Sequence, residues 1–253
     1  MSSTAAPAEH SDHERPDFAH QRTVGVVLAG AIIGGWVAVH LLMVWVYEFG
    51  QHPLWIAPLA IALQTWLSVG LFIVAHDCMH GSLAPFRPRV NLWVGRIALR
   101  LYAGLGYDRL RPKHFAHHAA PGTEHDPDFD AAHPRNFWPW FGTFMREYLN
   151  LRDFVVLVVA FHVYIFVLGA PFENVIAFWA VPAWLSALQI FYFGTYLPHR
   201  EEEEAFSDTH RSRSNDYPWL VSLLTCFHFG YHHEHHRHPR VPWWQLPRMR
   251  FSR

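Results

Sequence analysis

Two long segments of this chain carry no lysine or arginine, and they limit its fold more than any other feature. They cover residues 24–86 and 154–199 of a chain of 253 residues. All 20 basic residues lie outside them, two before the first segment, ten between the segments and eight after the second. Because a helix needs about 20 apolar residues to cross the hydrocarbon core of a bilayer, each segment is long enough for two membrane-spanning helices.

Turn-forming residues at 50–53 and 169–171 divide each segment in two. The expected spans cover residues 24–49, 54–75, 154–168 and 175–197. The third is short and must recruit flanking residues or thin the bilayer. These segments are apolar on all sides, whereas a soluble core helix has a polar stripe, so an integral membrane protein is favoured over a soluble bundle. His40 and His162 lie inside the spans without a histidine at helical spacing, so both are expected to be packing residues.

The basic residues predict how the spans are oriented. Loops rich in lysine and arginine stay on the cytoplasmic side of a membrane. Both termini and the connection 87–153 are therefore expected in the cytoplasm, with two helical hairpins dipping into the bilayer. Residues 1–20 are expected to be a disordered tail without a cleavable signal peptide, followed by a single membrane-embedded domain over 21–250. The expected fold class is all-α, with four transmembrane helices and a cytoplasmic helical cap that holds a metal site.

Two further features indicate contact with the membrane surface. The segment 91–105 is apolar but carries Arg96 and Arg100, so it is expected to form an interfacial or re-entrant helix on the cytoplasmic side. Four tryptophans are expected at the level of the lipid headgroups, where aromatic side chains form a belt: Trp138, Trp140, Trp243 and Trp244.

Histidine is far more frequent than a hydrophobic core requires, at 21 copies. Three clusters stand out, HDCMH at 76–80, HFAHH at 114–118 and HHEHH at 232–236. In the second and third clusters, positions i, i+3 and i+4 carry imidazoles that share one face of a helix. All three clusters fall on the side predicted to be cytoplasmic, as does His199 at the end of the last span. His228 lies one helical turn before the third cluster.

These residues form a set of ten candidate metal ligands: His76, His80, His114, His117, His118, His199, His228, His232, His235 and His236. Ten converging imidazoles are too many for one metal and indicate two. Imidazole suits zinc, copper, iron and nickel, so the ligands alone leave the metal open. His233 points off the shared face of its cluster and is not expected to bind. The same holds for histidines outside the clusters: His10, His13, His20, His52, His125, His133, His210 and His238.

Several other functions lack their sequence signals. The chain has no HExxH motif and no Glu-x-x-His motif, which argues against a thermolysin-like protease and a ferritin-like di-iron bundle. It has no Gly-rich nucleotide motif, and its net charge of −1 excludes a strongly basic nucleic-acid binder. Two cysteines cannot build a disulfide framework or a cysteine-rich zinc site.

The motifs resemble those of a known family. The runs are HDCMHGS at 76–82, KHFAHH at 113–118, HDPDF at 125–129, FHFGYHHEHH at 227–236 and PWWQLP at 242–247. The histidine boxes resemble the membrane fatty-acid desaturase and hydroxylase superfamily, and the longer runs resemble its bacterial-type β-carotene ketolases. The resemblance covers about residues 20–250.

The resemblance implies a non-haem centre of two irons. Its ligands would be the eight histidines of the three boxes, while His199 and His228 resemble additional ligands of desaturases. Asp77 would either orient a histidine of the first box or act as a helix-end polar residue. Asp126 and Asp128 are expected as turn or capping residues rather than catalytic ones, because Pro127 separates them.

The resemblance also implies an activity. Bacterial-type ketolases are enzymes of the inner membrane that use O₂ to oxidise C4 of a β-ionone ring. Two hydroxylations and a loss of water lead from β-carotene through echinenone to canthaxanthin, and from zeaxanthin to astaxanthin. The chain has no flavin, haem or iron–sulfur motif, so an external reduced ferredoxin is expected as electron donor.

Two alternatives stay open at this point. The histidine boxes alone also suit a fatty-acid desaturase or a carotenoid ring hydroxylase. A membrane zinc hydrolase or metal transporter is a rival of a different class, although a transporter should place its ligands near the bilayer midplane.

Overall fold

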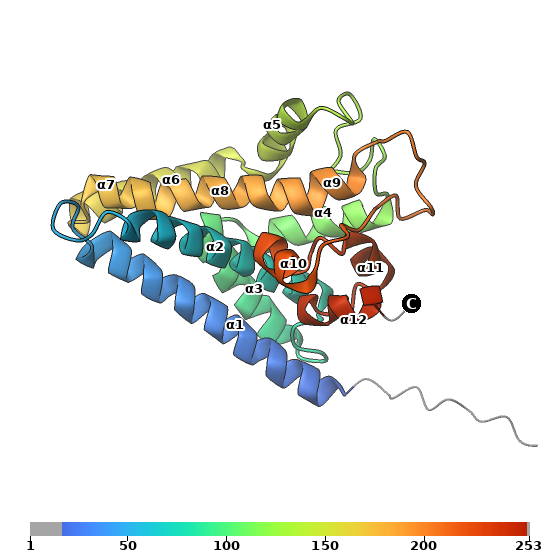
Figure 1. Cartoon of the computed structure of the whole chain (residues 1–253), viewed down its shortest axis with the longest axis horizontal. Coiled ribbons are helices and arrows are strands. Elements are labelled where there is room, and N and C mark those ends of the chain that lie inside the picture. The colour runs from blue at the N-terminus through green and yellow to red at the C-terminus, as the bar shows by residue number, and fades with distance from the viewer. Residues whose placement is uncertain (1–16, 252–253) are drawn as a thin grey trace, which may run out of the picture.

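The computed structural model describes residues 17–251, and its regular structure there is helical (Figure 1). Of the predicted tail over residues 1–20, residues 1–16 lie outside the described residues. Residues 18–20 are helical, because α1 (Phe18–Leu41) begins there. The carboxylate of Asp17 accepts hydrogen bonds from the backbone nitrogens of Ala19 and His20 and so caps this helix.

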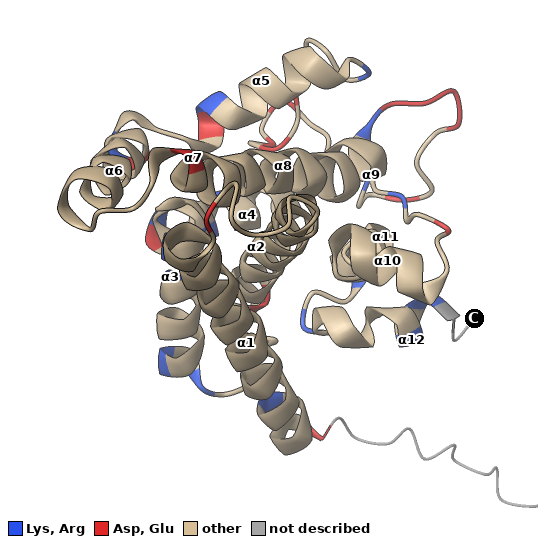
Figure 2. Cartoon of the chain, turned by 60° about the vertical axis from the view of Figure 1, so that its left-hand side comes forward, with Lys and Arg blue, Asp and Glu red and all other residues tan. Residues whose placement is uncertain are grey.

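Within residues 17–251, three helices are long and apolar enough to cross a membrane. The first is α1, which continues with wider π-type turns through Val46, and the second is α2 (Ile56–His80). The third runs without a break over Phe172–His199 and combines α7 (Phe172–Val175), α8 (Val181–Ile190) and α9 (Leu197–His199). Figure 2 shows that charged residues lie mostly toward the ends of these long helices and in the connections.

The structure differs from the prediction at the third span. Residues 151–167 form α6 (Leu151–His162) and a π-type extension, and α5 (Phe137–Tyr148) precedes them. The two helices meet at an angle of 84°, and they add a fourth span only if the bent pair is counted as one. Residues 17–251 therefore hold three such helices, or four if the bent pair is one span, and the arrangement in two hairpins stays a prediction.

Shorter helices gather at one end of the long ones (Figure 1). They are α4 (Tyr107–Ala119), α10 (Trp219–Cys226), α11 (His232–Arg237) and α12 (Leu246–Phe251). The segment expected as an interfacial or re-entrant helix forms α3 (Pro88–Ala103), which packs along α2. A Cβ atom on Gly95 would lie 2.3 Å from Cε2 of Tyr107 and 3.0 Å from Cβ of Cys78, so this contact requires glycine.

Two of the four tryptophans assigned to a lipid belt lie inside the protein instead. Trp140 is 1% exposed and Trp243 is 7% exposed, whereas Trp138 is 69% exposed. Nε1 of Trp140 donates to the backbone oxygen of Asp128, at 2.7 Å. The prediction is wrong for Trp140 and Trp243, because neighbouring residues of the protein cover both side chains.

Candidate metal centre

The helices place histidines of distant segments at one end of the molecule. The second predicted span extends five residues past its expected end, so α2 carries both His76 and His80 on its last turns. It stops at Gly81, whose φ of +72° lies in the left-handed region that glycine adopts without strain. The second box lies on α4, the third begins α11, and His199 ends α9.

The structure brings nine of the ten candidate histidines into two groups. The first group contains five residues: His76, His80, His114, His118 and His235. The second group contains four: His117, His199, His232 and His236. Within each group, one ring nitrogen of every residue lies within 4.8 Å of those of the others. Each group thus has the shape of a site for one ion, and the stacked rings of His118 and His236, 4.3 Å apart, join the two groups.

The two groups divide the second and third boxes in opposite ways. On α4, His114 and His118 belong to the first group and His117 to the second. On α11, His235 alone belongs to the first group, and His232 and His236 belong to the second. Residues four apart point in nearly the same direction from a helix, so each turn offers a pair to one ion and a third ligand to the other.

The ring nitrogens are arranged as ligands rather than as ordinary hydrogen-bonding groups. Nε2 of His235 lies 3.0 Å from Nε2 of His118, and Nε2 of His117 lies 3.1 Å from Nε2 of His236. Nδ1 of His199 donates to the backbone oxygen of Arg211 at 2.8 Å, which leaves its buried Nε2 with a lone pair and no partner among residues 17–251. Clustered lone pairs of this kind fit bound metal ions, and imidazole nitrogen suits iron.

Burial keeps most of these rings in the neutral form that binds metal. Burial lowers the pKa of His118 to about 2, with neighbouring histidines adding to the effect. It also lowers the pKa of His114, His232, His235 and His236 well below the ordinary value. His117 differs, because burial opposes its protonation but the carboxylates of Asp128 and Asp126 raise its pKa.

Asp126 has a role beyond the expected turn. Its carboxylate accepts from Nδ1 of His117, at 2.9 Å and 3.0 Å, and from the backbone nitrogens of Gly122 and Asp128. Such a bond fixes the ring and directs its Nε2 lone pair toward a metal. The short spacing between the second box and the aspartates was the available signal, but a turn explains the same spacing. Asp128 lies beside it, and burial raises the pKa of its carboxyl group to about 6.

Asp77 lies next to the first group, but its hydrogen bond joins two segments of the chain. Its Oδ1 lies 3.5 Å from Nδ1 of His76 without forming a hydrogen bond, and Nδ1 of His76 has no partner within the described residues. Its Oδ2 accepts from the backbone nitrogen of Trp243 at 3.1 Å. Of the two roles expected for Asp77, the contacts favour the structural one, because this bond joins the C-terminal segment to the end of α2.

His228 does not join either group, which corrects the expectation that it lies on the same helical face as His232. Phe227 and His228 have φ values of +48° and +61°, and α11 begins only at His232. This left-handed turn breaks the helix, and the ring of His228 packs 5.1 Å from that of Trp219. The expected non-ligands among the described residues also lie outside both groups: His20, His52, His125, His133, His210, His233 and His238.

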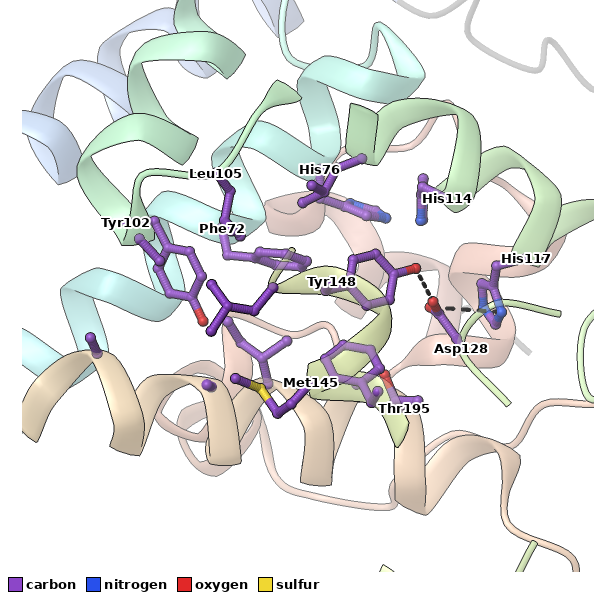
Figure 3. Close-up of a pocket in the computed structure, with 18 of the residues that line it drawn as sticks. Phe72, His76, Tyr102, Leu105, His114, His117, Asp128, Met145, Tyr148 and Thr195 are labelled. Carbon is purple, nitrogen blue, oxygen red and sulfur yellow. Dashed lines mark hydrogen bonds and ion pairs between the residues drawn. The ribbon is translucent and has the colours of Figure 1, made fainter. Parts of the chain in front are cut away.

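A cavity of about 260 Å³ lies against both histidine groups (Figure 3). His76 and His114 of the first group and His117 and His232 of the second line it. The remaining wall is mostly apolar and comes from α2, α3, α5, α6 and α8. Its lining includes Phe154 and Trp184, which are 51% and 58% exposed on the outer helices. The cavity can therefore hold an apolar group and connects the histidines with the surface of apolar helices.

The comparison with known proteins agrees with this geometry. The family model described as fatty acid desaturase matches residues 50–156 and 146–251. The chain is 47% identical over 237 residues to a beta-carotene ketolase of Paracoccus sp. (strain PC1), covering 93% of this chain and 96% of the relative.

Two further relatives carry the same name. One, from Paracoccus sp. (strain N81106 / MBIC 01143), is 47% identical and covers 89% of this chain and 91% of the relative. The other, from Haematococcus lacustris, is 36% identical and covers 96% of this chain and 86% of the relative. The chain therefore belongs to the fatty acid desaturase family, within its branch of bacterial-type β-carotene ketolases.

Proposed function

We propose that this protein is a carotenoid 4-ketolase with two non-haem irons. The observation that carries the proposal is the apolar cavity, which is lined by two histidines of each group. The names of the relatives support the substrate class, since they are ketolases of β-carotene. The reaction converts the C4 methylene of β-carotene to a ketone, first in echinenone and then at both rings in canthaxanthin, and it converts zeaxanthin to astaxanthin.

The chemical balance of the reaction defines what the site must provide. Each oxidation of C4 consumes one O₂, two electrons and two protons, replaces C–H by C–OH and releases water. A second oxidation of the same carbon gives a gem-diol, which loses water to leave the ketone. When bound, two irons would supply the activation of O₂ that these steps require. Zinc, which has no redox chemistry, would not.

The residues of the chain hold and orient the reactants. The first group would hold one iron through five imidazoles and the second group the other through four. Asp126 fixes the ring of His117, and the backbone oxygen of Arg211 fixes that of His199. The apolar wall of the cavity binds the β-ionone ring and excludes water, and the exposed Phe154 and Trp184 would admit the polyene from the lipid.

The membrane placement supports the supply of both substrates. We infer a protein of the bacterial inner membrane, with the termini and the histidine groups on the cytoplasmic side, because loops rich in arginine stay there. An apolar carotenoid then enters from the bilayer, and electrons arrive from water. A reduced ferredoxin is the donor that fits a chain without a flavin, haem or iron–sulfur motif.

The proposal is tested on membranes that contain the full chain. The membranes are given β-carotene, O₂ and a reduced ferredoxin with its reductase, and the pigments are identified by mass and absorption. We expect echinenone and canthaxanthin, formed only with O₂ and reductant, and two irons per purified chain. Zeaxanthin as the product would indicate a ring hydroxylase, and desaturated lipid would indicate a desaturase. Bound zinc with no oxygen-dependent product would overturn the oxygenase assignment.

A further inference from the structure

Four polar side chains other than histidine line the cavity: Tyr102, Asp128, Tyr148 and Thr195. The hydroxyl of Tyr148 donates a hydrogen bond to Oδ1 of Asp128 (Figure 3). Figure 3 shows this pair directed toward His117, whereas Tyr102 lies at the other end of the cavity. The cavity therefore has one polar corner beside the histidine groups.

One carboxylate oxygen of Asp128 has no hydrogen-bond donor among the described residues of this corner. This Oδ2 lies 3.8 Å from Nδ1 of His117, and that nitrogen donates its hydrogen bond to Asp126 instead. Within residues 17–251, Oδ2 of Asp128 accepts no hydrogen bond, and the side chain is only 15% exposed. Because Asp128 lines the cavity, this oxygen can accept a hydrogen bond from a group bound there. A ligand that carries a hydroxyl would supply that donor.

The tyrosine holds the carboxylate in this position. Tyr148 ends α5, and its ring lies 5.3 Å from the ammonium nitrogen of Lys113, which pairs with Glu147. The backbone nitrogen of Asp128 also donates to Oδ1 of Asp126, at 2.8 Å. Hydrogen bonds therefore hold both Oδ1 and the backbone nitrogen of Asp128, so its Oδ2 has a defined direction.

The reaction proposed above forms such a hydroxyl. An unoxidised β-ionone ring has no polar atom and gains nothing from Asp128, whereas the singly oxidised ring carries a hydroxyl on C4. We propose that Asp128, positioned by Tyr148, accepts a hydrogen bond from this hydroxyl and retains the alcohol for the second oxidation. The inference rests on the proposed ketolase function and assigns the cavity a preference for its own intermediate.

The experiment compares the variants Tyr148→Phe and Asp128→Leu with the wild-type protein, all as full-length chains. Tyr102→Phe is the matched control, since it removes a hydroxyl from the opposite end of the same cavity. The first readout is the ratio of 4-hydroxylated carotenoid to ketone released from β-carotene. Loss of a hydrogen bond to a charged group lowers the binding affinity about tenfold or more. We expect this ratio to rise about tenfold in both variants and to stay at the wild-type value in Tyr102→Phe.

The second readout is binding without turnover. Purified protein is titrated with 4-hydroxylated carotenoid and with β-carotene in the absence of O₂ and reductant. The preference for the hydroxylated ligand should fall about tenfold in Tyr148→Phe and Asp128→Leu. If the affinities for both ligands fall equally, or if the product ratio is unchanged, Asp128 does not bind the hydroxyl and its role is structural. A wild-type protein that binds the alcohol preferentially but forms no ketone would support the inference while refuting the proposed activity.

Discussion

Nδ1 of His117 donates to the carboxylate of Asp126 at 2.9 Å, and this bond aims the opposite nitrogen of the ring at the second histidine group. The same carboxylate holds the turn that follows α4 through the backbone nitrogens of Gly122 and Asp128. One side chain thus couples the geometry of a candidate metal ligand to the fold of the loop beside it.

Replacing Asp126 should weaken one of the two proposed metal sites. In Asp126→Ala, His117 loses the partner that orients its ring, and metal affinity should drop about 10- to 100-fold. Asp130→Ala is the control, because Asp130 pairs with His133, which is in neither group. Iron per chain after dialysis against a chelator is the measurement. Equal iron retention by the two variants would show that the bond to His117 is dispensable.

The division of the third box predicts that adjacent histidines serve different ions. His235→Ala should lose the ion of the first group and His236→Ala that of the second, so each should retain about half of the wild-type iron. Both should lose ketolase activity. His233→Ala is the control, since its ring contacts Asp208 at 3.5 Å and lies in neither group. Metal analysis combined with iron spectroscopy of the purified variants would distinguish the two residual sites. Identical spectra from His235→Ala and His236→Ala would contradict the division.

His228 should prove dispensable for metal binding. Asparagine tolerates the left-handed backbone at this position, so His228→Asn should keep the turn and the full iron content. His232→Asn, four residues on, removes a member of the second group and should lose iron. Metal content of the two proteins side by side is the check, and comparable iron loss in both would return His228 to the ligand set.

Filling the cavity should separate substrate binding from metal binding. Ala187 lines the cavity on α8, and a phenylalanine there would occupy space intended for the β-ionone ring. Ala187→Phe should reduce ketone formation at least about tenfold while both irons stay bound. Leu185→Phe, on the exposed face of the same helix, should behave as wild type. Full activity in Ala187→Phe would move the substrate site elsewhere.

Gly95 should matter for stability because α3 and α4 meet there without space for a side chain. Gly95→Ala places a Cβ 2.3 Å from the ring of Tyr107 and should destabilise the protein by about 1–3 kcal/mol. In Gly30→Ala the new Cβ meets nothing within 4 Å, so no loss is expected. Thermal unfolding of the detergent-solubilised variants measures the difference, and equal midpoints would refute the tight contact.

Much of the architecture could be read from local sequence. Apolar length alone predicted the long helices over Phe18–Val46, Ile56–His80 and Phe172–His199 to within a few residues at most ends. Their exact limits depend on other signals, such as the cap at Asp17 and the left-handed glycine after His80. The 84° bend between α5 and α6 was not predicted, because apolar content does not indicate where two consecutive helices change direction.

The sequence by itself determined the ligand type, the boxes and the family, because spacings of three and four residues place histidines on one side of a single helical turn. Only the tertiary structure decided which histidine joins which group, because that depends on where α2, α4, α9 and α11 meet. It also placed His228 outside both groups, because a left-handed turn precedes the helix there, and gave Asp126 its partner nine residues away. Contacts between segments far apart in the chain leave no periodic trace in the sequence, so the cavity and its polar corner emerge only when the helices are packed together.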